Sequence, residues 1–348
     1  MRRGWLVAAG ATVVVVVLAV VAGFRFLNWF SSPTLSSDGS PSVSVAVTDV
    51  ATGLRSPWGL AFRPDGTALV SERDTGRVVE VRDGRVTEVA RLDSRHRGEG
   101  GLLGIALSPD GWLYAYYTTA DDNRIVRLRP GAGGSPEVLV TGIPAAGIHN
   151  GGRLAFGPDG FLYAGTGDAD RTSRAQDRDD LGGKILRMTP EGRPAPGNPF
   201  GTLVWSYGHR NVQGFGWASD GTMYASEFGQ NRYDELNRIE AGRNYGWPEV
   251  EGDSDRFTRP LATWTTADAS PSGLAVIGDR VYVAGLRGRT LWRVTRDGGS
   301  AERLLDDAYG RLRTVAQAPD GSVWVVTSNT DGRGDPRNGD DRILRFTP

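Results

Sequence analysis

The stretch that decides the fold runs from Leu154 to Tyr163 and reads LAFGPDGFLY. It contains a short apolar run, a Pro-Asp-Gly turn, and a second apolar run that ends in an aromatic residue. Asp-Gly between two such runs is a strong hairpin signal, because glycine accepts the positive φ that a tight turn requires. The stretch therefore predicts two antiparallel strands joined by a tight turn.

The same phrase, or a close relative of it, occurs six times along the chain. Its turn aspartates are Asp65, Asp110, Asp159, Asp220, Asp279 and Asp320. Successive turns are 45, 49, 61, 59 and 41 residues apart, and these intervals bracket the length of a four-stranded propeller blade. Internal repetition at this period is typical of radial β architectures.

A third strand with alternating charged and apolar residues follows in most units, for example Arg77 to Val81 and Lys184 to Met188. Such alternation marks a strand with one solvated face. Six units with no left-over segment predict an all-β fold, a six-bladed β-propeller of four-stranded blades. Because the pattern begins with Val43 to Val50 and ends on Phe346, we expect the first strand to complete the last blade.

Composition agrees with many short strands and excludes several classes of function. The 348 residues include 49 glycines, 19 prolines and 10 tryptophans, which suits an architecture rich in tight turns. Forty basic residues against 41 acidic ones give a net charge of -1, unlike the basic surface of a nucleic-acid-binding protein. The chain has no cysteine, which excludes disulfides, thiolate metal sites and cysteine nucleophiles.

The first thirty residues predict an N-terminal membrane anchor. Arg2 and Arg3 precede an uncharged run from Gly4 to Phe24, which approaches the length needed to cross a bilayer, and the two arginines favour a cytoplasmic start. A cleaved signal segment, ending near Val20 and Ala22, is the alternative. In either case the folded part is expected outside the cytoplasm, either anchored to the membrane or secreted.

The remaining chain divides into a linker and one large domain. Residues 31–44 are rich in serine, proline and aspartate, a composition that favours a flexible linker. Residues 45–348 are expected to form the propeller as a single domain.

Polar residues gather at one position of the repeat. The innermost strands of a propeller run in the same direction along its channel, so the residues just before them meet at one mouth. The residues found there are Pro57-Trp58, Glu99, His149-Asn150, Arg210-Asn211, Ser270 to Ser272, Arg311 and Arg313. Such convergence in a concave site is typical of binding or catalysis.

Each of these residues also has a plainer interpretation. A single arginine is more often a solvated surface residue, but three arginines at one mouth favour an anionic ligand such as a carboxylate. A neutral imidazole at His149 could take a proton from a hydroxyl group near neutral pH, whereas the alternative is a hydrogen-bonded structural histidine. For His96 and His209 we expect structural or solvated roles.

Three loops carry acidic residues, and a fourth segment, 244–248, carries other oxygen donors. Residues 227–235 (EFGQNRYDE) and 244–248 (NYGWP) contain oxygen donors and glycine, a weak pattern for calcium, which takes six to eight oxygen ligands including backbone carbonyls. Residues 168–180 and 331–341 lack the spacing of a calcium loop. We therefore expect the last two to be solvated loops.

The assembled phrases resemble the family of soluble quinoprotein glucose and sorbosone dehydrogenases, and within it the bacterial aldose sugar dehydrogenases that use pyrroloquinoline quinone (PQQ). The resemblance covers nearly all of Val50 to Phe346. It rests on five phrases in order, GEGGLLG (98–104), HNGGRL (149–154), GHRN (208–211), NYGWP (244–248) and RLR (311–313).

The resemblance implies oxidation of an aldose at its anomeric carbon to the lactone, with PQQ and calcium as cofactors. It implies that His149 is the base, and that calcium is held by the main-chain oxygens of Gly229 and Gln230 and polarises the quinone. Glu235 and Tyr245 match a second, structural calcium position. The cofactor contacts that it implies are Glu99, Arg210, Asn211, Arg287, Arg311 and Arg313.

The chain departs from the best-known glucose dehydrogenases at three places. Glu99 stands where they carry a glutamine, Ile148 stands where an aspartate precedes the histidine, and Arg287 stands where they carry a lysine. These changes keep PQQ binding and argue against a strict preference for glucose.

Two other functions fit the same fold, since a fold does not determine chemistry. One is a calcium-dependent lactonase-like hydrolase, which we would expect to hold its metal with several axial carboxylates. The other is a non-catalytic propeller that binds a glycan or a protein partner, which would need neither a base at His149 nor three arginines.

Overall fold

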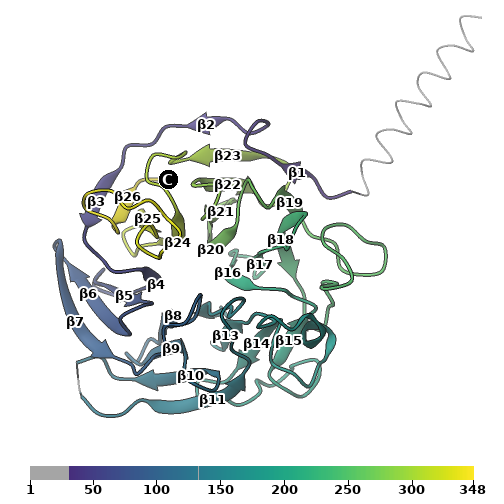
Figure 1. Cartoon of the computed structure of the whole chain (residues 1–348), viewed down its shortest axis with the longest axis horizontal. Helices are drawn as coiled ribbons and strands as arrows, with labels where there is room; N and C mark the ends of the chain where they lie inside the picture. The colour runs from purple at the N-terminus through teal and green to yellow at the C-terminus, as the bar shows by residue number, and fades with distance from the viewer. Residues whose placement is uncertain (1–30, 132) are drawn as a thin grey trace, which may run out of the picture.

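The computed structural model describes residues 31–131 and 133–348, which form a ring of six antiparallel sheets (Figure 1). Blade 1 consists of β4 (Pro57–Phe62), β5 (Ala68–Glu72), β6 (Arg77–Arg82) and β7 (Arg85–Arg91), and blade 2 of β8 (Leu102–Leu107), β9 (Leu113–Thr118), β10 (Asn123–Leu128) and β11 (Glu137–Ile143). Blade 3 consists of β12 (Leu154–Phe156), β13 (Leu162–Gly165), β14 (Lys184–Met188) and β15 (Val204–Tyr207).

The second half of the ring follows the same order. Blade 4 consists of β16 (Val212–Trp217), β17 (Met223–Glu227), β18 (Tyr233–Ile239) and β19 (Ala262–Thr265), and blade 5 of β20 (Pro271–Ile277), β21 (Arg280–Gly285), β22 (Leu291–Thr295) and β23 (Ala301–Leu304). Blade 6 consists of β24 (Leu312–Gln317), β25 (Val323–Thr327), β26 (Ile343–Phe346) and β3 (Thr48–Ala51). The prediction of a six-bladed propeller with four-stranded blades is confirmed.

The first strand of the ring closes the last blade, as predicted. In the register of β3 and β26, Ala51 lies opposite Ile343 and Thr48 lies opposite Arg345. Both ends of the domain are thereby hydrogen-bonded within one sheet, and this pairing closes the ring.

Apolar clusters fill the wedges between neighbouring blades, and β-branched and aromatic residues supply most of them. Between blades 4 and 5, for example, the rings of Trp264 and Trp292 lie 5.9 Å apart, and both residues are fully buried. Near the axis the inner strands come so close that side chains are excluded. A Cβ added to Gly104 of β8 would lie 2.1 Å from the carbonyl oxygen of Gly152, just before β12.

Residues 33–43 pack against the ring, which differs from the flexible linker predicted for residues 31–44. β1 (Thr34–Leu35) pairs in parallel with β19, and β2 (Ser42–Val43) pairs in parallel with β23, so that each adds a fifth strand to a blade. Leu35 is buried among the apolar residues between blades 4 and 5. The Ser- and Pro-rich composition did not reveal this packing, because the hydrogen-bond partners are strand edges more than 200 residues away.

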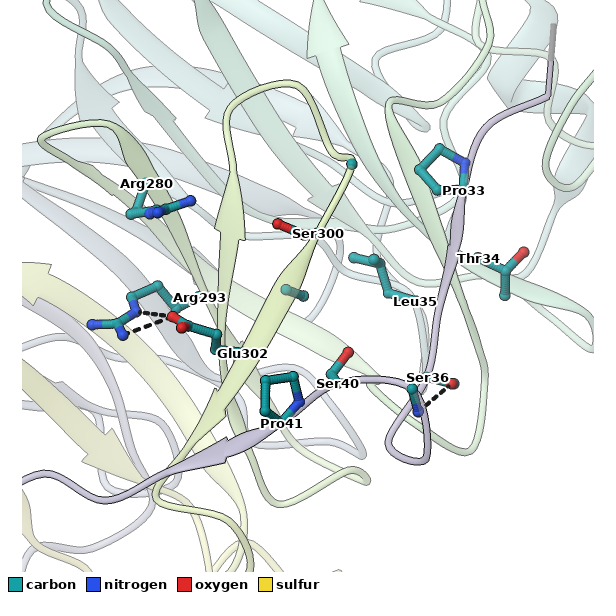
Figure 2. A pocket seen from close by; sticks show the side chains of 13 residues that line it. Pro33, Thr34, Leu35, Ser36, Ser40, Pro41, Arg280, Arg293, Ser300 and Glu302 are labelled. Atoms are coloured by element: carbon teal, nitrogen blue, oxygen red, sulfur yellow. Dashed lines mark hydrogen bonds and ion pairs between the residues drawn. The ribbon is translucent and has the colours of Figure 1, made fainter. Parts of the chain in front are cut away.

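A hollow of about 420 Å³ lies between this N-terminal segment and blade 5 (Figure 2). It is lined by Arg280 and by the ion pair of Arg293 with Glu302, whose closest atoms are 2.6 Å apart. The hollow borders the outer strand β23, away from the axis on which the predicted site residues converge.

The predicted membrane anchor or signal segment, residues 1–30, lies outside the described residues. Within the part of the chain that the structure does describe, none of the helices has the length and apolar character to span a bilayer.

Candidate active site

His149 and Asp168 form a hydrogen-bonded pair at the mouth of the propeller. His149 lies just before β12 and Asp168 follows β13 of the same blade. Nδ1 of His149 is 2.7 Å from Oδ1 of Asp168, and the indole N–H of Trp247 donates to the other carboxylate oxygen at 2.8 Å. A buried carboxylate that accepts from Nδ1 favours the tautomer whose lone pair is on Nε2. The imidazole is thus arranged as a base.

Asp168 is an exception to the prediction that residues 168–180 form a solvated loop, because it is completely buried, whereas residues 170–173 and 177–179 are exposed. The short 3-10 helix η1 (Thr172–Gln176) follows it and covers this corner of the mouth. The acidic composition of the loop did not indicate that the Asp168 carboxylate is directed inward.

The backbone of His149 is held in a left-handed conformation, with φ of 56°, which non-glycine residues rarely adopt and which costs conformational energy. Its N–H donates to a carboxylate oxygen of Glu99 at 2.9 Å, and its carbonyl accepts the N–H of Ala169 at 3.1 Å. The second oxygen of Glu99 pairs with Arg333 at 2.8 Å. Glu99 therefore links the base to a loop of blade 6.

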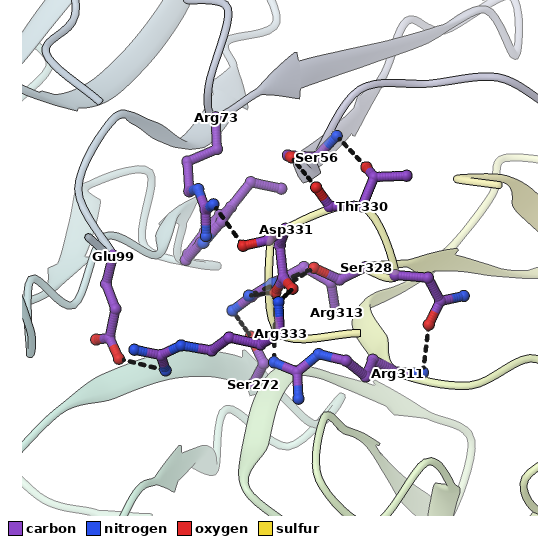
Figure 3. A network of polar contacts seen from close by, with 12 residues as sticks. Ser56, Arg73, Glu99, Ser272, Arg311, Arg313, Ser328, Thr330, Asp331 and Arg333 are labelled. Carbon is purple, nitrogen blue, oxygen red and sulfur yellow. Dashed lines mark hydrogen bonds and ion pairs between the residues drawn. The ribbon is translucent and has the colours of Figure 1, made fainter. Parts of the chain in front are cut away.

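Arg311 and Arg313 meet around Asp331 (Figure 3). Their guanidinium groups lie 3.3 Å and 3.2 Å from the same oxygen of Asp331, and the carbonyl of that residue accepts from Arg73 at 3.2 Å. Arg313 also donates to the side-chain oxygen of Gln213 at 2.9 Å. Burial lowers the pKa of Arg313 to about 10, so the protein holds this charge at a cost.

Asp331 is likewise an exception to the prediction of a solvated loop for residues 331–341, since only 1% of its side chain is exposed, whereas residues 335–338 are exposed. Asp341, at the other end of that segment, is fully buried and accepts the N–H groups of Asn329 and Thr330. The segment folds over the mouth because these two carboxylates are directed inward.

Arg210 and Asn211 lie on the side of the mouth next to the base. The guanidinium group of Arg210 lies 5.4 Å from the ring of Trp247 and donates to the carbonyl of Phe228 at 3.3 Å, and burial lowers its pKa. The side-chain oxygen of Asn211 accepts the N–H of Gly151 at 2.9 Å. Arg210 lines a small hollow that shares Phe228 with the hollow lined by Arg311 and Arg313.

These arginines retain unused hydrogen-bond donors. The Nε groups of Arg210, Arg311 and Arg313 are buried and have no hydrogen-bond partner within the described residues. Buried donors are rarely left unpaired, so the arrangement fits an anionic ligand. The hollow at this point is lined by Glu99, Asn211, Arg311 and Arg313 together with residues not predicted, among them Arg73, Gln213, Asp331 and Arg333.

Arg287, like Arg210, is a predicted cofactor contact that does not line this hollow. Its neighbour Leu286 does so, whereas Arg287 itself is exposed. The role that the resemblance implies for it stays a prediction.

The loop that carries Gly229 and Gln230 is shaped by two carboxylates. One oxygen of Glu251 accepts the backbone N–H groups of residues 230, 231, 232 and 233 at 2.9–3.3 Å, and Asp234 accepts that of Gly229 at 2.9 Å. Within residues 31–131 and 133–348, no hydrogen bond to the carbonyl oxygen of Gly229 or Gln230 is present. Two backbone oxygens are therefore available to a cation.

Glu235 and Tyr245 border one small buried hollow but are not bonded to each other. Glu235 accepts from the N–H of Gly252 at 2.7 Å, and burial together with the nearby Glu227 raises its pKa to about 8. The hydroxyl of Tyr245 donates to the carbonyl of Arg238 at 2.7 Å. No group of three or more His, Asp or Glu side chains suited to a metal occurs in the described part of the chain. A calcium ion here stays a prediction.

The other two histidines have the roles expected of them. His209 is completely buried, with Nδ1 2.7 Å from Glu227 and its ring stacked on Tyr245 at 4.6 Å between ring centres. The side chain of His96 is 43% exposed and lies 3.3 Å from Asp74. Neither belongs to the hollow at the axis.

Four of the residues that sequence reasoning missed share one position in the repeat. Arg73, Asp168, Asp331 and Arg333 all lie in the loop after the second strand of their blade. That strand is antiparallel to the inner strand, so its end returns to the same mouth. Polar residues that follow the second strand of each blade should have been considered together with those that precede the inner strand.

Comparisons with known proteins identify the family. A model of the glucose/sorbosone dehydrogenase family matches residues 54–344. The structure of the PQQ-bound form of aldose sugar dehydrogenase from Streptomyces coelicolor is 52% identical and covers 89% of this chain and 99% of that chain, with a TM-score of 0.83.

Two curated relatives extend the comparison. An uncharacterized protein of Synechocystis is 32% identical over 83% of this chain and 85% of its own length. The aldose sugar dehydrogenase of Escherichia coli is 29% identical over 81% of this chain and 90% of its own length. With the family match extending over nearly the whole ring and the site residues at its mouth, the chain belongs to the glucose/sorbosone dehydrogenase family.

Proposed function

We propose that this protein is a PQQ-dependent aldose sugar dehydrogenase, which oxidises the anomeric carbon of an aldose to the lactone. The observation that supports this most directly is a base held by a buried carboxylate beside three arginines with unpaired buried donors. The relative from Streptomyces coelicolor, an aldose sugar dehydrogenase with bound PQQ, shares 52% of its residues with this chain.

The arginines fit the charge of the cofactor. PQQ carries three carboxylates, and Arg210, Arg311 and Arg313 would supply three cations with Nε donors still unused. Arginine suits carboxylates because its planar group donates two parallel hydrogen bonds. Asn211 would contribute a further polar contact, and Glu99 would border the cofactor on the side of the base.

His149 would act as the general base. With Nδ1–H donated to Asp168, Nε2 would take the proton of the anomeric hydroxyl, and the resulting imidazolium would be stabilised by the buried carboxylate. PQQ, when bound, supplies the quinone to which hydride leaves from the same carbon. The sugar thus loses one proton and one hydride and becomes the lactone.

Calcium would bind at the loop after β17. The free carbonyl oxygens of Gly229 and Gln230 would be its main-chain ligands, and Glu251 and Asp234 would keep those oxygens directed outward by holding the N–H groups. Calcium held there would polarise a quinone carbonyl as a Lewis acid. At Glu235 and Tyr245 we propose a second, structural ion.

The sugar specificity is expected to be broad, because Glu99, Ile148 and Arg287 replace residues of the strict glucose enzymes. We also propose that the propeller lies outside the cytoplasm and is attached to a membrane only through residues 1–30. The charge balance, a net -1, agrees with a function that does not involve nucleic acid.

The test is reduction of an artificial dye by the purified protein with PQQ, calcium and a panel of aldoses. We expect activity that is lost in His149→Ala and kept in His96→Ala, a matched control at the same face. Lactone hydrolysis without PQQ would instead favour the hydrolase, and inactivity in both assays would favour the binding protein.

A further inference from the structure

Lys184 is the single lysine among the 40 basic residues of the chain, and it is completely buried. Lysine is almost never fully buried without partners, because desolvation of the ammonium group is costly. Burial lowers the pKa of Lys184 to about 8. All the other basic residues counted here are arginines, so Lys184 supplies the one lysine ammonium group of the sequence.

The ammonium group binds three carbonyl oxygens. Nζ donates to Gly182 at 2.6 Å, to Arg174 at 2.7 Å and to Ala175 at 3.3 Å. Arg174 and Ala175 belong to the last turn of η1, where helix carbonyls lack partners within the helix and favour a cation. Three acceptors match the three N–H groups of lysine.

The backbone next to Lys184 is tightly packed. A Cβ on the preceding Gly183 would lie 2.4 Å from the carbonyl oxygen of His209 and 2.9 Å from Ala175, so the backbone is tightly packed on both sides. A planar guanidinium group with five fixed donors needs more room and more acceptors than a compact ammonium group does.

The loop that Lys184 holds also holds Asp168. The guanidinium group of Arg174 donates to the carbonyls of Asp168 and Ala169, both at 3.1 Å. Gln176 donates to the carbonyl of Trp247 at 2.7 Å, and Trp247 in turn donates to the Asp168 carboxylate. Two contacts thus support Asp168, one from Arg174 to its backbone and one from Trp247 to its carboxylate. Both depend on η1, whose carbonyl oxygens bind the Lys184 ammonium group.

We propose that Lys184 is a positioning residue for the catalytic base, which acts by fixing η1 and thereby the carboxylate of Asp168 against Nδ1 of His149. This role rests on the proposed function of His149. It assigns to the buried lysine a task beyond stability, namely to keep the imidazole in the tautomer that accepts a proton on Nε2.

The test compares Lys184→Met with Met188→Ala in the full-length protein. Met188 is also fully buried and lies at the other end of β14, so its variant lowers stability without touching η1. We expect Lys184→Met to lower kcat by about tenfold or more with little change in the KM for the sugar, because an oriented base contributes only in the transition state. Met188→Ala should keep kcat.

A second readout needs neither cofactor nor turnover. ¹⁵N spectra of labelled histidine, with His149 assigned through His149→Gln, should show the Nδ1–H tautomer in the unmodified apoprotein and a mixture of tautomers in Lys184→Met. Arg174→Ala removes the links to the carbonyls of Asp168 and Ala169 and a 3.4 Å ion pair with Asp180, and it leaves Lys184 in place. It should shift the spectrum in the same direction and serves if Lys184→Met does not fold.

The outcomes separate the two proposals. An unchanged His149 spectrum in both Lys184→Met and Arg174→Ala, or a loss of kcat equal to that of Met188→Ala, would overturn the positioning role. Absence of dye reduction by the unmodified protein would overturn the dehydrogenase function, while the spectra would still decide whether Lys184 positions the imidazole.

Discussion

At the scale of single residues, the site depends on which nitrogen of His149 carries the proton. The carboxylate of Asp168 accepts from Nδ1, and its other oxygen is occupied by Trp247, so it cannot rotate away. A neutral amide in its place would donate to Nδ1 and leave the proton on Nε2. The base would then be present in the wrong tautomer.

We therefore expect Asp168→Asn to lower kcat by roughly a thousandfold or more while PQQ affinity changes little. Steady-state kinetics and a PQQ titration measure the two effects. Asp170→Asn, at an exposed residue two positions further on, is the matched control and should keep kcat. Equal activity of the two variants would exclude the proposed pair.

The ion pair of Arg333 with Glu99 allows a finer prediction at the same scale. Arg333→Ala frees the carboxylate that holds the N–H of His149, but the side chain of Arg333 is 56% exposed, and exposed pairs contribute at most about 1 kcal/mol. We expect kcat/KM to fall by about two- to fivefold, and the difference to shrink at high salt, which screens exposed charges.

The control for that variant is Arg289→Ala. Arg289 pairs at 3.4 Å with Asp335, which lies in the loop that carries Arg333, but Arg289 makes no contact with Glu99. Kinetics across a salt series should show no loss for Arg289→Ala. A loss of equal size in both variants would mean that the loop as a whole, and not the contact with Glu99, affects the base.

At the scale of elements, the N-terminal segment is an integral part of blades 4 and 5. Its two short strands cover the outer edges of β19 and β23, and exposed strand edges promote association with other chains. The segment is also anchored by Leu35, which is 6% exposed, and by the N–H of Ser32, which donates to Asp253 at 2.6 Å.

Leu35→Ala should lower the free energy of unfolding by about 2–4 kcal/mol, the usual cost of truncating a buried leucine. Denaturant unfolding measures it. Val138→Ala, an aliphatic residue that is 50% exposed on β11, should change the value by no more than about 0.5 kcal/mol. Similar values for the two variants would mean that the segment contributes nothing to the fold.

At the scale of the whole molecule, the ring gathers charge from blades 3, 4 and 6 at one mouth, so ligands that fill the mouth should stabilise the entire propeller. A ligand that binds only the native state adds about 2.7 kcal/mol at a hundred times its Kd. We expect PQQ with calcium to raise the melting temperature by several degrees, and a calcium chelator to reverse part of the rise.

Thermal unfolding with and without both ligands is the measurement. Arg311→Ala and Arg313→Ala should each reduce the shift caused by PQQ, because each removes a cation from the anion site, whereas Arg289→Ala should leave it unchanged. An equal shift in all variants would contradict binding at this mouth.

The sequence by itself determined the ring and one half of its mouth. Turn chemistry and strand alternation are local properties, so six copies of one phrase specify six blades, and equal positions in the copies predict that His149, Arg210, Arg311 and Arg313 lie at one mouth. Five short phrases were enough to indicate the family, because each lies at a fixed place in the repeat.

Only the tertiary structure decided which carboxylates serve those residues and where the first described residues lie. Asp168 and Asp331 belong to polar loops whose composition is that of solvated turns, and their burial depends on side chains contributed by other blades or by distant parts of the same blade. Residues 33–43 form strands because distant blades offer free edges. Partners of this kind are set by packing of the complete ring, which no local pattern encodes.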